Sequence, residues 1–189
     1  MTELEKLRAG LEYDFTDPEV DSLKLNAVKL CQKLNAIDVT EISAREEIIR
    51  ELFGSVGKNP VLRPGFNCDF MKNIYVGDNF LADYNVIFHG DGEIHIGDNV
   101  TIMPNSVIAT VKIPMNPKNR RQHKTTATPV TIGNDVWIGA NVLVMPGVTI
   151  GNNVVITVGA IVTKDVPDNS LIGGVPAKVL KTLIDDTEA

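Results

Sequence analysis

An aliphatic or small residue recurs at every sixth position through the C-terminal part of this chain. The first ladder of such residues consists of Val130, Val136, Val142, Val148, Val154, Ala160 and Val166. A second ladder lies two residues further along and consists of Ile132, Ile138, Val144, Ile150, Ile156 and Val162. An amphipathic helix would need a period of about 3.6 residues, and an antiparallel meander would place its turns roughly 8–12 residues apart. The period of six instead predicts a solenoid of short strands and turns stacked around one core.

The same two ladders recur upstream, between residues 74 and 108. Their members are Ile74, Phe80, Val86, Ile94, Val100 and Ser106 in the first, and Val76, Ala82, Phe88, Ile96, Ile102 and Ile108 in the second. Glycine, Asn and Asp residues lie between the ladder positions, as is typical of tight turns. We therefore expect a mainly β chain in which three six-residue units form one triangular coil of a parallel β-helix.

The ladders are interrupted twice. They slip by two residues at residues 89–92, and they stop altogether between residues 111 and 128. The longer gap is rich in proline, asparagine and cationic residues, which predicts a loop that protrudes from the coil. Because binding groups concentrate on loops held by a rigid scaffold, loop 111–128 is a candidate for part of a site.

Residues 1–57 are expected to form a helical segment before the repeats, and residues 58–189 a β-helix domain with the loop and a C-terminal tail. Asp17 followed by Pro18 predicts a helix start. The apolar face of that helix would comprise Val20, Leu23, Leu25, Val28, Leu30 and Leu34. A second helix is expected from about Ser43, and together they would cover one open end of the coil, whose strand edges invite aggregation. A last helix or an extended tail is expected from Ala177.

Composition excludes several classes of function. The net charge of −6 and the isoelectric point near 5.0 argue against a nucleic-acid partner, which needs an excess of clustered cations. No apolar stretch is long enough for a transmembrane helix, and the first residues mix acidic and basic side chains unlike a signal peptide. Cys31 and Cys68 have no zinc-binding spacing, so we expect no metal and a reducing, cytoplasmic location.

Four stretches of the sequence carry a resemblance to a known family. They are RAG-x-x-Y at residues 8–13, ELFGSVG at 51–57, IGDN at 96–99 and the run from PVTIGNDVWIGA to GGVPAKVL at 129–180. With them the chain resembles, over essentially its full length, the maltose and galactoside O-acetyltransferases. The resemblance implies a left-handed β-helix and a homotrimer with active sites between neighbouring coils. It also implies acetyl-CoA as the donor and a sugar hydroxyl as the acceptor.

The resemblance implies a donor site along the groove between two coils. The positions that match the family's CoA-binding residues are Ala140, Val158, Thr163, Lys164, Lys178 and Lys181, with Trp137 near them. Family members often have arginine where this chain has Lys178 and Lys181. Lysine keeps the positive charge that nucleotide phosphates attract but loses the bidentate fork of a guanidinium. Two other interpretations stay open, a solvated cationic tail for the lysines and a packed corner for Trp137.

On the acceptor side, the resemblance points to four aspartates, Asp14, Asp69, Asp83 and Asp91. Carboxylates suit sugar binding because they accept hydrogen bonds from hydroxyl groups. Asp17 is a weaker candidate than Asp14 for the N-terminal position, since it can cap a helix. The alternative role for these residues is turn formation, which aspartate favours.

At the general base, this chain departs from the family pattern. The resemblance places that base, a histidine followed by proline, at the position of Ile113, which has no proton acceptor. Candidates to replace it are Asp83, which stands where the family has asparagine, and His123 in the same loop. His89, beside the two-residue slip, is a comparable alternative. His95 alternates with core residues and should point outward from the coil.

Three hypotheses of function follow from these patterns. The leading one is an O-acetyltransferase that moves an acetyl group from acetyl-CoA to a sugar hydroxyl, weakened or with a displaced base because of Ile113. The second is a non-catalytic trimeric homologue that binds CoA or a sugar. The third, a purely structural trimer, is disfavoured because polar or charged residues stand at most of the matched site positions.

Overall fold

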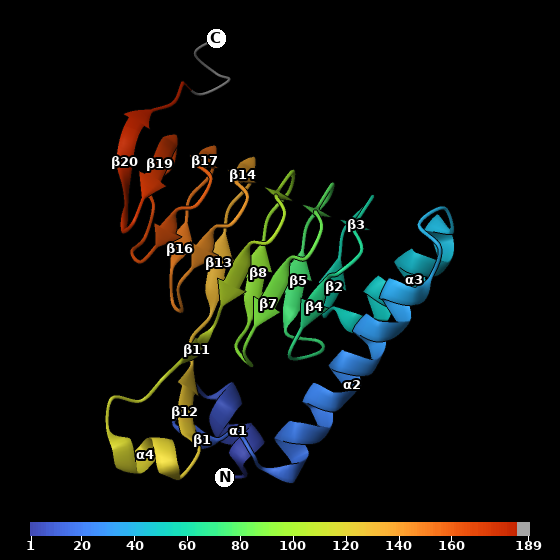
Figure 1. Ribbon diagram of the computed structural model, residues 1–189, viewed down its shortest axis with the longest axis vertical. Coiled ribbons are helices and arrows are strands. Elements are labelled where there is room, and N and C mark those ends of the chain that lie inside the picture. Colours follow the sequence, from blue (N-terminus) through green and yellow to red (C-terminus); the bar gives the residue numbers. More distant parts are fainter. Residues whose placement is uncertain (185–189) are drawn as a thin grey trace.

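Three sheets of short strands form the sides of a solenoid in the computed structural model, which describes residues 1–184 (Figure 1). Sheet I contains β2 (Ser55–Val56), β5 (Ile74–Val76), β8 (Ile94–Ile96), β13 (Val130–Ile132) and β16 (Thr149–Ile150). Sheet II contains β3 (Val61–Leu62), β6 (Leu81–Ala82), β9 (Thr101–Ile102), β14 (Val136–Ile138), β17 (Val154–Ile156), β19 (Ser170–Gly174) and β20 (Ala177–Thr182). Sheet III contains β4 (Asn67–Cys68), β7 (Ile87–His89), β10 (Val107–Ala109), β15 (Leu143–Val144) and β18 (Ile161–Val162). Each coil passes from sheet I to sheet II to sheet III, which confirms the β-helix predicted from the period of six.

The remaining elements lie outside the coil. The helices are α1 (Glu3–Arg8), α2 (Pro18–Ala36), α3 (Ile42–Leu52) and α4 (Pro117–Arg121). A small antiparallel sheet is made of β1 (Tyr13–Asp14), β11 (Val111–Lys112) and β12 (Lys124–Ala127).

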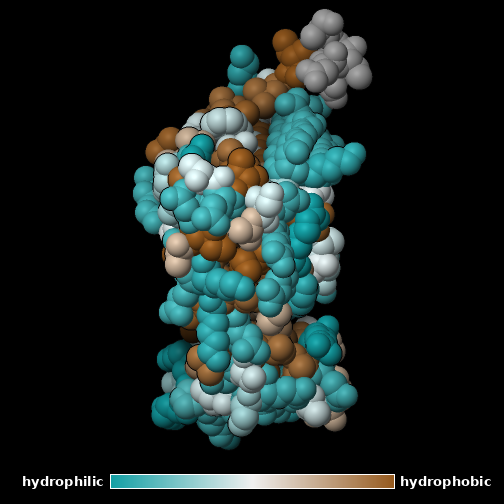
Figure 2. All heavy atoms as spheres, turned by 90° about the vertical axis from the view of Figure 1, so that its right-hand side faces the viewer, coloured by the Kyte–Doolittle hydropathy of each residue, from teal (hydrophilic) through white to brown (hydrophobic). Residues whose placement is uncertain are grey.

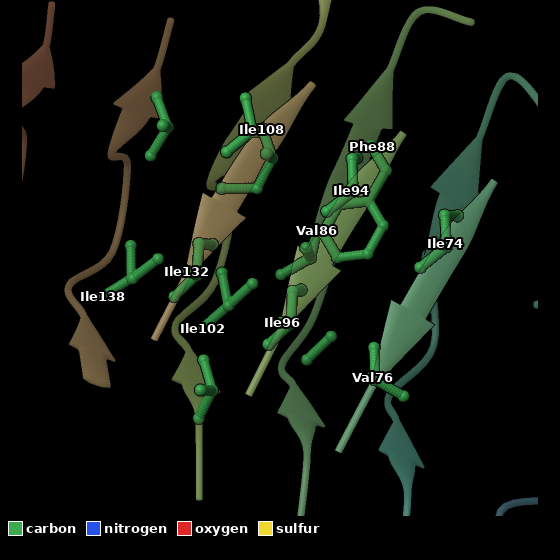
Figure 3. Packing of buried hydrophobic residues seen from close by; sticks show 14 of the residues in the cluster. Ile74, Val76, Val86, Phe88, Ile94, Ile96, Ile102, Ile108, Ile132 and Ile138 are labelled. Carbon is green, nitrogen blue, oxygen red and sulfur yellow. The ribbon is translucent and has the colours of Figure 1, made fainter. Parts of the chain in front are cut away.

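Both aliphatic ladders point into the space between the three sheets (Figure 3). On β8, Ile94 and Ile96 are buried, whereas His95 between them points outward as predicted and has 44% of its side chain exposed. Ser106 also occupies a buried ladder position. Its Oγ donates to the carbonyl of Gly139 at 2.8 Å and accepts from the N–H of Val142 at 3.1 Å, so the hydroxyl is satisfied inside an apolar core.

Asparagine residues with a left-handed backbone form turns between sheets I and II. Asn79, Asn99 and Asn153 have φ angles of 57°, 56° and 50°, a region that asparagine enters more readily than other non-glycine residues. Their side chains also form a ladder along the coil. Nδ2 of Asn79 donates to Oδ1 of Asn99 at 2.9 Å, and Nδ2 of Asn99 donates to Oδ1 of Asp135 at 2.9 Å. The turn residues of the repeat therefore set the turn conformation and also link successive coils.

Helices α2 and α3 cover the end of the solenoid where the coil begins (Figure 1). Asp17 caps α2 as predicted, with Oδ1 accepting from the N–H of Glu19 at 3.0 Å. The predicted apolar face is partly wrong, because Leu25 and Val28 are 52% and 41% exposed. Val20 and Leu34 of the predicted face are buried, and Ala27 and Cys31 complete the buried stripe of α2. Seen from this side, the molecule is mostly hydrophilic with smaller hydrophobic areas between (Figure 2).

The segment 111–128, expected to be a loop, is an ordered arm. Strands β11 and β12 and helix α4 form the arm, and β1 from the N-terminal segment adds a third strand beside β12. A second apolar core lies under this sheet and consists of Leu4, Leu7, Tyr13, Val20, Phe70 and Ala127. The N-terminal segment therefore has two roles, because α2 and α3 cover the coil while α1 and β1 support the arm (Figure 1). Strand β2 already belongs to sheet I, so the coil begins within segment 1–57.

Residues 177–182 form a strand, so the helical alternative for this segment is wrong and the extended one is right. Strand β20 pairs antiparallel with β19 and widens sheet II. This register places Lys178 beside Gly173 and Lys181 beside Leu171. Within residues 1–184, no helix is long and apolar enough to cross a membrane.

Substitutions at Asn99 separate the contribution of the turn backbone from that of the side-chain ladder. Asn99→Gly keeps the left-handed turn but removes two hydrogen bonds, each worth about 0.5–1.5 kcal/mol. Asn99→Ala removes the same bonds and adds the roughly 1–2 kcal/mol that a left-handed backbone costs a residue with a Cβ atom. We expect both variants to unfold at lower guanidinium concentration than the natural protein, with the alanine variant unfolding first. Equal midpoints for the two variants would contradict the backbone contribution.

Candidate functional site

A cavity of about 380 Å³ lies where the arm meets the corner between sheets III and I. On the coil side, Asp69 follows β4 and His89 ends β7, one coil further along. The rest of the lining consists of Phe15, Lys24, Gly90, Asp91, Val111, Ile113, Pro114, Arg120, Lys124 and Thr125. The cavity therefore joins the two-residue slip, the arm and helix α2, and it contains the position expected for the family's base, Ile113.

Asp69 and His89 form a hydrogen-bonded pair in the cavity wall. Nδ1 of His89 lies 2.6 Å from Oδ2 of Asp69, and the N–H of Gly90 donates to the same oxygen at 2.7 Å. Partial burial raises the pKa of Asp69, but the hydrogen bonds from His89 and Gly90 outweigh burial and hold that pKa below its ordinary value. The hydrogen bond with Asp69 raises the pKa of His89 above its ordinary value, although partial burial opposes this. More than half of the imidazole, 56%, remains exposed.

Asp91 belongs to a buried network at the base of the cavity. The hydroxyl of Tyr13 donates to Oδ2 of Asp91 at 2.5 Å, and Nζ of Lys24 lies 2.9 Å from the same oxygen. Asp91 is 2% exposed and Tyr13 is fully buried, so burial and then the nearby carboxylate raise the pKa of Tyr13 well above its ordinary value. The carboxylate of Asp91 thus ties the N-terminal segment and α2 to the coil.

The structure places Asp14 and His123 outside the cavity lining. Oδ1 of Asp14 accepts from the N–H and the hydroxyl of Thr16 at 2.9 and 2.7 Å, and these bonds lower the pKa of Asp14. His123 is exposed, and its ring centroid lies 5.4 Å from that of Phe15. Within one chain, therefore, His123 contacts Phe15 at the edge of the cavity without lining it, and Asp14 is engaged in its own turn. Asp17 only caps α2.

Asp83 lies at a different corner of the coil, between sheets II and III. Its Oδ1 accepts from the N–H of Tyr84 at 2.8 Å and lies 3.4 Å from Nε of Arg63. A single chain therefore does not bring Asp83 together with the cavity of Asp69 and Ile113.

The predicted donor-site residues divide between two corners as well. Thr163 and Lys164 follow β18 at the corner between sheets III and I, on the side of the cavity. Ala140 and Val158 lie at the corner between sheets II and III, where the N–H of Gly159 donates to the carbonyl of Ala140 at 2.9 Å.

The other predicted donor-site residues lie on sheet II. Trp137 points outward from β14 and is 49% exposed. Lys178 and Lys181 are exposed on β20, and Lys178 borders the same small pocket as Lys164.

An apolar groove of about 660 Å³ extends the site along the coil. Its lining includes Ile113 and Met115 from the arm, Met145 and Pro146 after β15, and Thr163 after β18. The groove thus connects the position of the family's base with one of the predicted donor-site residues. Among residues 1–184, no group of three or more His, Cys, Asp or Glu side chains could hold a metal ion.

Sequence reasoning ranked His89 only as an alternative and did not consider Lys24 or Tyr13. A signal for His89 is present, because Cys68 and Phe88 occupy equivalent positions one coil apart and the next residues, Asp69 and His89, must be neighbours. No comparable pattern points to Lys24, because the repeat of the coil does not show which residues of a docked helix face the cavity.

Two family models match the chain. Residues 6–57 match the maltose acetyltransferase hexapeptide capping motif, and residues 129–164 match the bacterial transferase hexapeptide with its six repeats. The matches cover helices α2 and α3 and the regular coils from β13 to β18.

Similarity to individual proteins extends over almost the whole chain. Galactoside O-acetyltransferase from Escherichia coli (strain K12) is 37% identical over 181 residues, which are 96% of this chain and 89% of the relative. The crystal structure of a maltose O-acetyltransferase from Clostridium difficile 630 has a TM-score of 0.95 at 41% identity, covering 98% of this chain and 99% of that one. A galactoside acetyltransferase in complex with coenzyme A has a TM-score of 0.92 at 35% identity, covering 98% of this chain and 92% of that one.

Removing the hydroxyl of Tyr13 tests the network that supports the cavity. Tyr13→Phe leaves the buried carboxylate of Asp91 without one of its donors, and a hydrogen bond to a charged group contributes about 1.5–3 kcal/mol. We expect a loss of unfolding free energy of that size in chemical denaturation. Tyr84→Phe is the matched control, because Tyr84 is 48% exposed and its change should leave stability nearly unaltered. Equal effects of the two changes would show that the buried bond contributes nothing.

Proposed function

We propose that this chain acetylates sugar hydroxyls, because it belongs to the maltose and galactoside O-acetyltransferase family of hexapeptide-repeat proteins. It is an acetyl-CoA-dependent O-acetyltransferase, and a family structure with coenzyme A bound supports the donor. We place the reaction in the cytoplasm, an assignment that the free, buried thiols of Cys31 and Cys68 support.

The proposal that the acceptor is a sugar rests on one observation, the composition of the cavity between the arm and the coil. One wall presents the carboxylate of Asp69 and the imidazole of His89, and the other presents the apolar side chain of Ile113. A sugar combines hydroxyl groups, which bond to carboxylates and imidazoles, with apolar C–H faces that pack against aliphatic side chains. Of the predicted aspartates in the cavity, Asp69 is the better placed to contact a ligand, because its side chain is 38% exposed and that of Asp91 is 3% exposed.

We propose that acetyl-CoA lies along the coil from the apolar groove toward sheet II. The groove suits the uncharged pantetheine arm of CoA, and the exposed cations Lys164, Lys178 and Lys181 suit its phosphates. Trp137 and Val158 are 49% and 70% exposed and offer apolar contacts for the rest of the donor. Ala140 lies one coil away from Val158 at the same corner and would line the donor site beside it.

The division of these residues between two corners supports a homotrimer with shared sites. Thr163 and the cavity belong to one corner of the coil, whereas Asp83 and Val158 belong to another. If three copies surround a common axis, the corner of one copy that holds Thr163 and the cavity lies beside the corner of the next copy that holds Asp83 and Val158. Each interface then contains the residues of both corners. Such a head-to-tail contact closes into a ring. It would also cover Ile113 and Met115, which are 72% and 90% exposed in the single chain.

Acetyl transfer to a panel of mono- and disaccharides tests the proposed acceptor. We expect release of free CoA to increase when a sugar is added to purified protein and acetyl-CoA, with acetylated sugar formed in equal amount. Simple aliphatic alcohols serve as the control, because they lack the array of hydroxyl groups that the cavity would recognise. CoA binding without transfer to any acceptor would favour the non-catalytic homologue instead.

Sedimentation equilibrium tests the proposed trimer. We expect a mass three times that of the 20.6 kDa chain across a tenfold dilution, because the exposed apolar arm and the second corner would be buried together. A stable monomer would contradict both the trimer and the shared site.

A further inference from the structure

We propose that His89 is the general base for acetyl transfer in this chain and that Asp69 positions it, an inference that rests on the transferase function above. Position 113, where the family has its base, carries an isoleucine that cannot accept a proton. Ile113 and His89 nevertheless line the same cavity. A hydroxyl group bound in that cavity is therefore within reach of another histidine, held on the rigid coil instead of the arm.

The contacts around His89 fix the orientation of its ring. Oδ2 of Asp69 lies 2.6 Å from Nδ1 of His89 and accepts from the N–H of Gly90 at 2.7 Å, so the carboxylate is fixed by the coil backbone. Because a carboxylate only accepts hydrogen bonds, Nδ1 carries a proton, and in the neutral imidazole the lone pair is therefore on Nε2. Within residues 1–184, Nε2 of His89 has no hydrogen-bond partner and is free for a ligand.

The other groups that could accept the proton are less well placed. His123 is exposed beside Phe15 and does not line the cavity. The ring of His95 stacks on Tyr75 on sheet I, with centroids 4.7 Å apart, and its Nε2 lies 2.8 Å from Glu93. Asp83 lies at another corner, beside Arg63. In the single chain, His89 is thus the histidine that faces the cavity of the acceptor proposal.

The reaction balances with His89 as the shuttle for one proton. Nε2 accepts the proton of the sugar hydroxyl while the hydroxyl oxygen forms a bond to the carbonyl carbon of acetyl-CoA. The carbon–sulfur bond then breaks with its electron pair on sulfur, and the imidazolium returns the proton to the departing thiolate of CoA. The carboxylate of Asp69 stabilises the imidazolium between these two steps and fixes the orientation of its ring.

The charges around His89 determine how the rate should depend on pH. Asp69 and Asp91 raise its pKa, whereas Lys24 lowers it. Arg120 and Lys124 also line the cavity, but Arg120 donates to the carbonyl of Pro114 in the arm and Lys124 lies 3.5 Å from Glu3. A base acts in its neutral form, so kcat/KM should fall as the pH decreases through the pKa of His89.

The first test compares three histidine variants of the full-length protein. His89→Gln should lower kcat by a factor on the order of 10² to 10⁴, the usual contribution of general acid–base catalysis, and leave the dissociation constant of CoA unchanged. His95→Gln is the matched control, because His95 is outside the site and its loss should leave kcat unchanged. His123→Gln tests the alternative that His123 is the base, and we expect it to change kcat little. A loss of kcat in the His123 variant but not in the His89 variant would overturn the proposal.

The second test distinguishes positioning by Asp69 from a purely structural role. Asp69→Asn removes the charge that raises the pKa of His89, so the acid limb of the kcat/KM profile should move to lower pH while the plateau falls. A variant that is merely less stable would lower the amplitude and leave the midpoint of the limb in place, and that result would overturn the role of Asp69. Thermal unfolding and CoA binding of each variant establish that the fold persists.

The same experiments separate this proposal from the proposed sugar acceptor. If the natural protein hydrolyses acetyl-CoA but acetylates no sugar, the acceptor proposal fails. His89→Gln must then lower the hydrolysis by the same factor for the base assignment to stand. If sugars are acetylated and His89→Gln is as fast as the natural protein, the base assignment fails alone. A natural protein that binds CoA yet releases none from acetyl-CoA in either assay overturns both.

Discussion

Backbone hydrogen bonding between successive coils is the constraint on which the rest of this structure depends. Along sheet III, the stacked residues Cys68, Phe88, Ile108, Val144 and Val162 are separated by 20, 20, 36 and 18 residues. One coil of three six-residue units needs 18 residues, so any further residues must bulge out of the coil. They cannot shift the register of the strands, because a one-residue slip would turn the core ladder outward. All of them leave the coil at the corner between sheets III and I, after β4, β7 and β10. The extra residues therefore all lie along this one corner of the coil. They form most of the cavity lining, and Phe15 and Lys24 from the N-terminal segment complete it.

The chemistry of the cavity follows from how these inserted residues are held. Asp69 follows β4 and His89 ends β7 in the next coil, so stacking of the coils brings the two residues side by side, with Nδ1 of His89 2.6 Å from Oδ2 of Asp69. Asp91 is buried, and its carboxylate is compensated by Tyr13 and Lys24, which come from the N-terminal segment. A buried carboxylate without such partners would cost several kcal/mol, on the order of 3–5 for a broken buried pair. Docking of the N-terminal segment and formation of the cavity are therefore energetically linked.

The sequence predicts the coil well because the same period of six recurs along both ladders. The strands, the inward ladders, the outward His95 and the cap at Asp17 all follow from period and local chemistry. The arm was expected to be a loop because its order depends on β1 and β12, which pair residues more than a hundred positions apart and leave no periodic signal. The exposure of Leu25 and Val28 has the same origin, since only the docked position of α2 decides which apolar residues face the coil. Of the predicted site residues, Asp69 and Asp91 line one cavity with Ile113. Asp83 and Val158 lie at another corner of the single chain, and no pattern in one sequence indicates how several copies associate.

The pairing of β1 with β12 has a consequence for the order in which the molecule is made. Each coil contacts mainly its neighbours, so the solenoid can extend turn by turn as the chain leaves the ribosome. The strand that supports the arm, β1, is synthesised before the coils, and its partner at Lys124–Ala127 emerges much later. A contact between positions this far apart in the sequence cannot form until the later strand has been synthesised. The nascent protein therefore carries finished early coils before it has a finished cavity, and catalytic competence is acquired late in biogenesis.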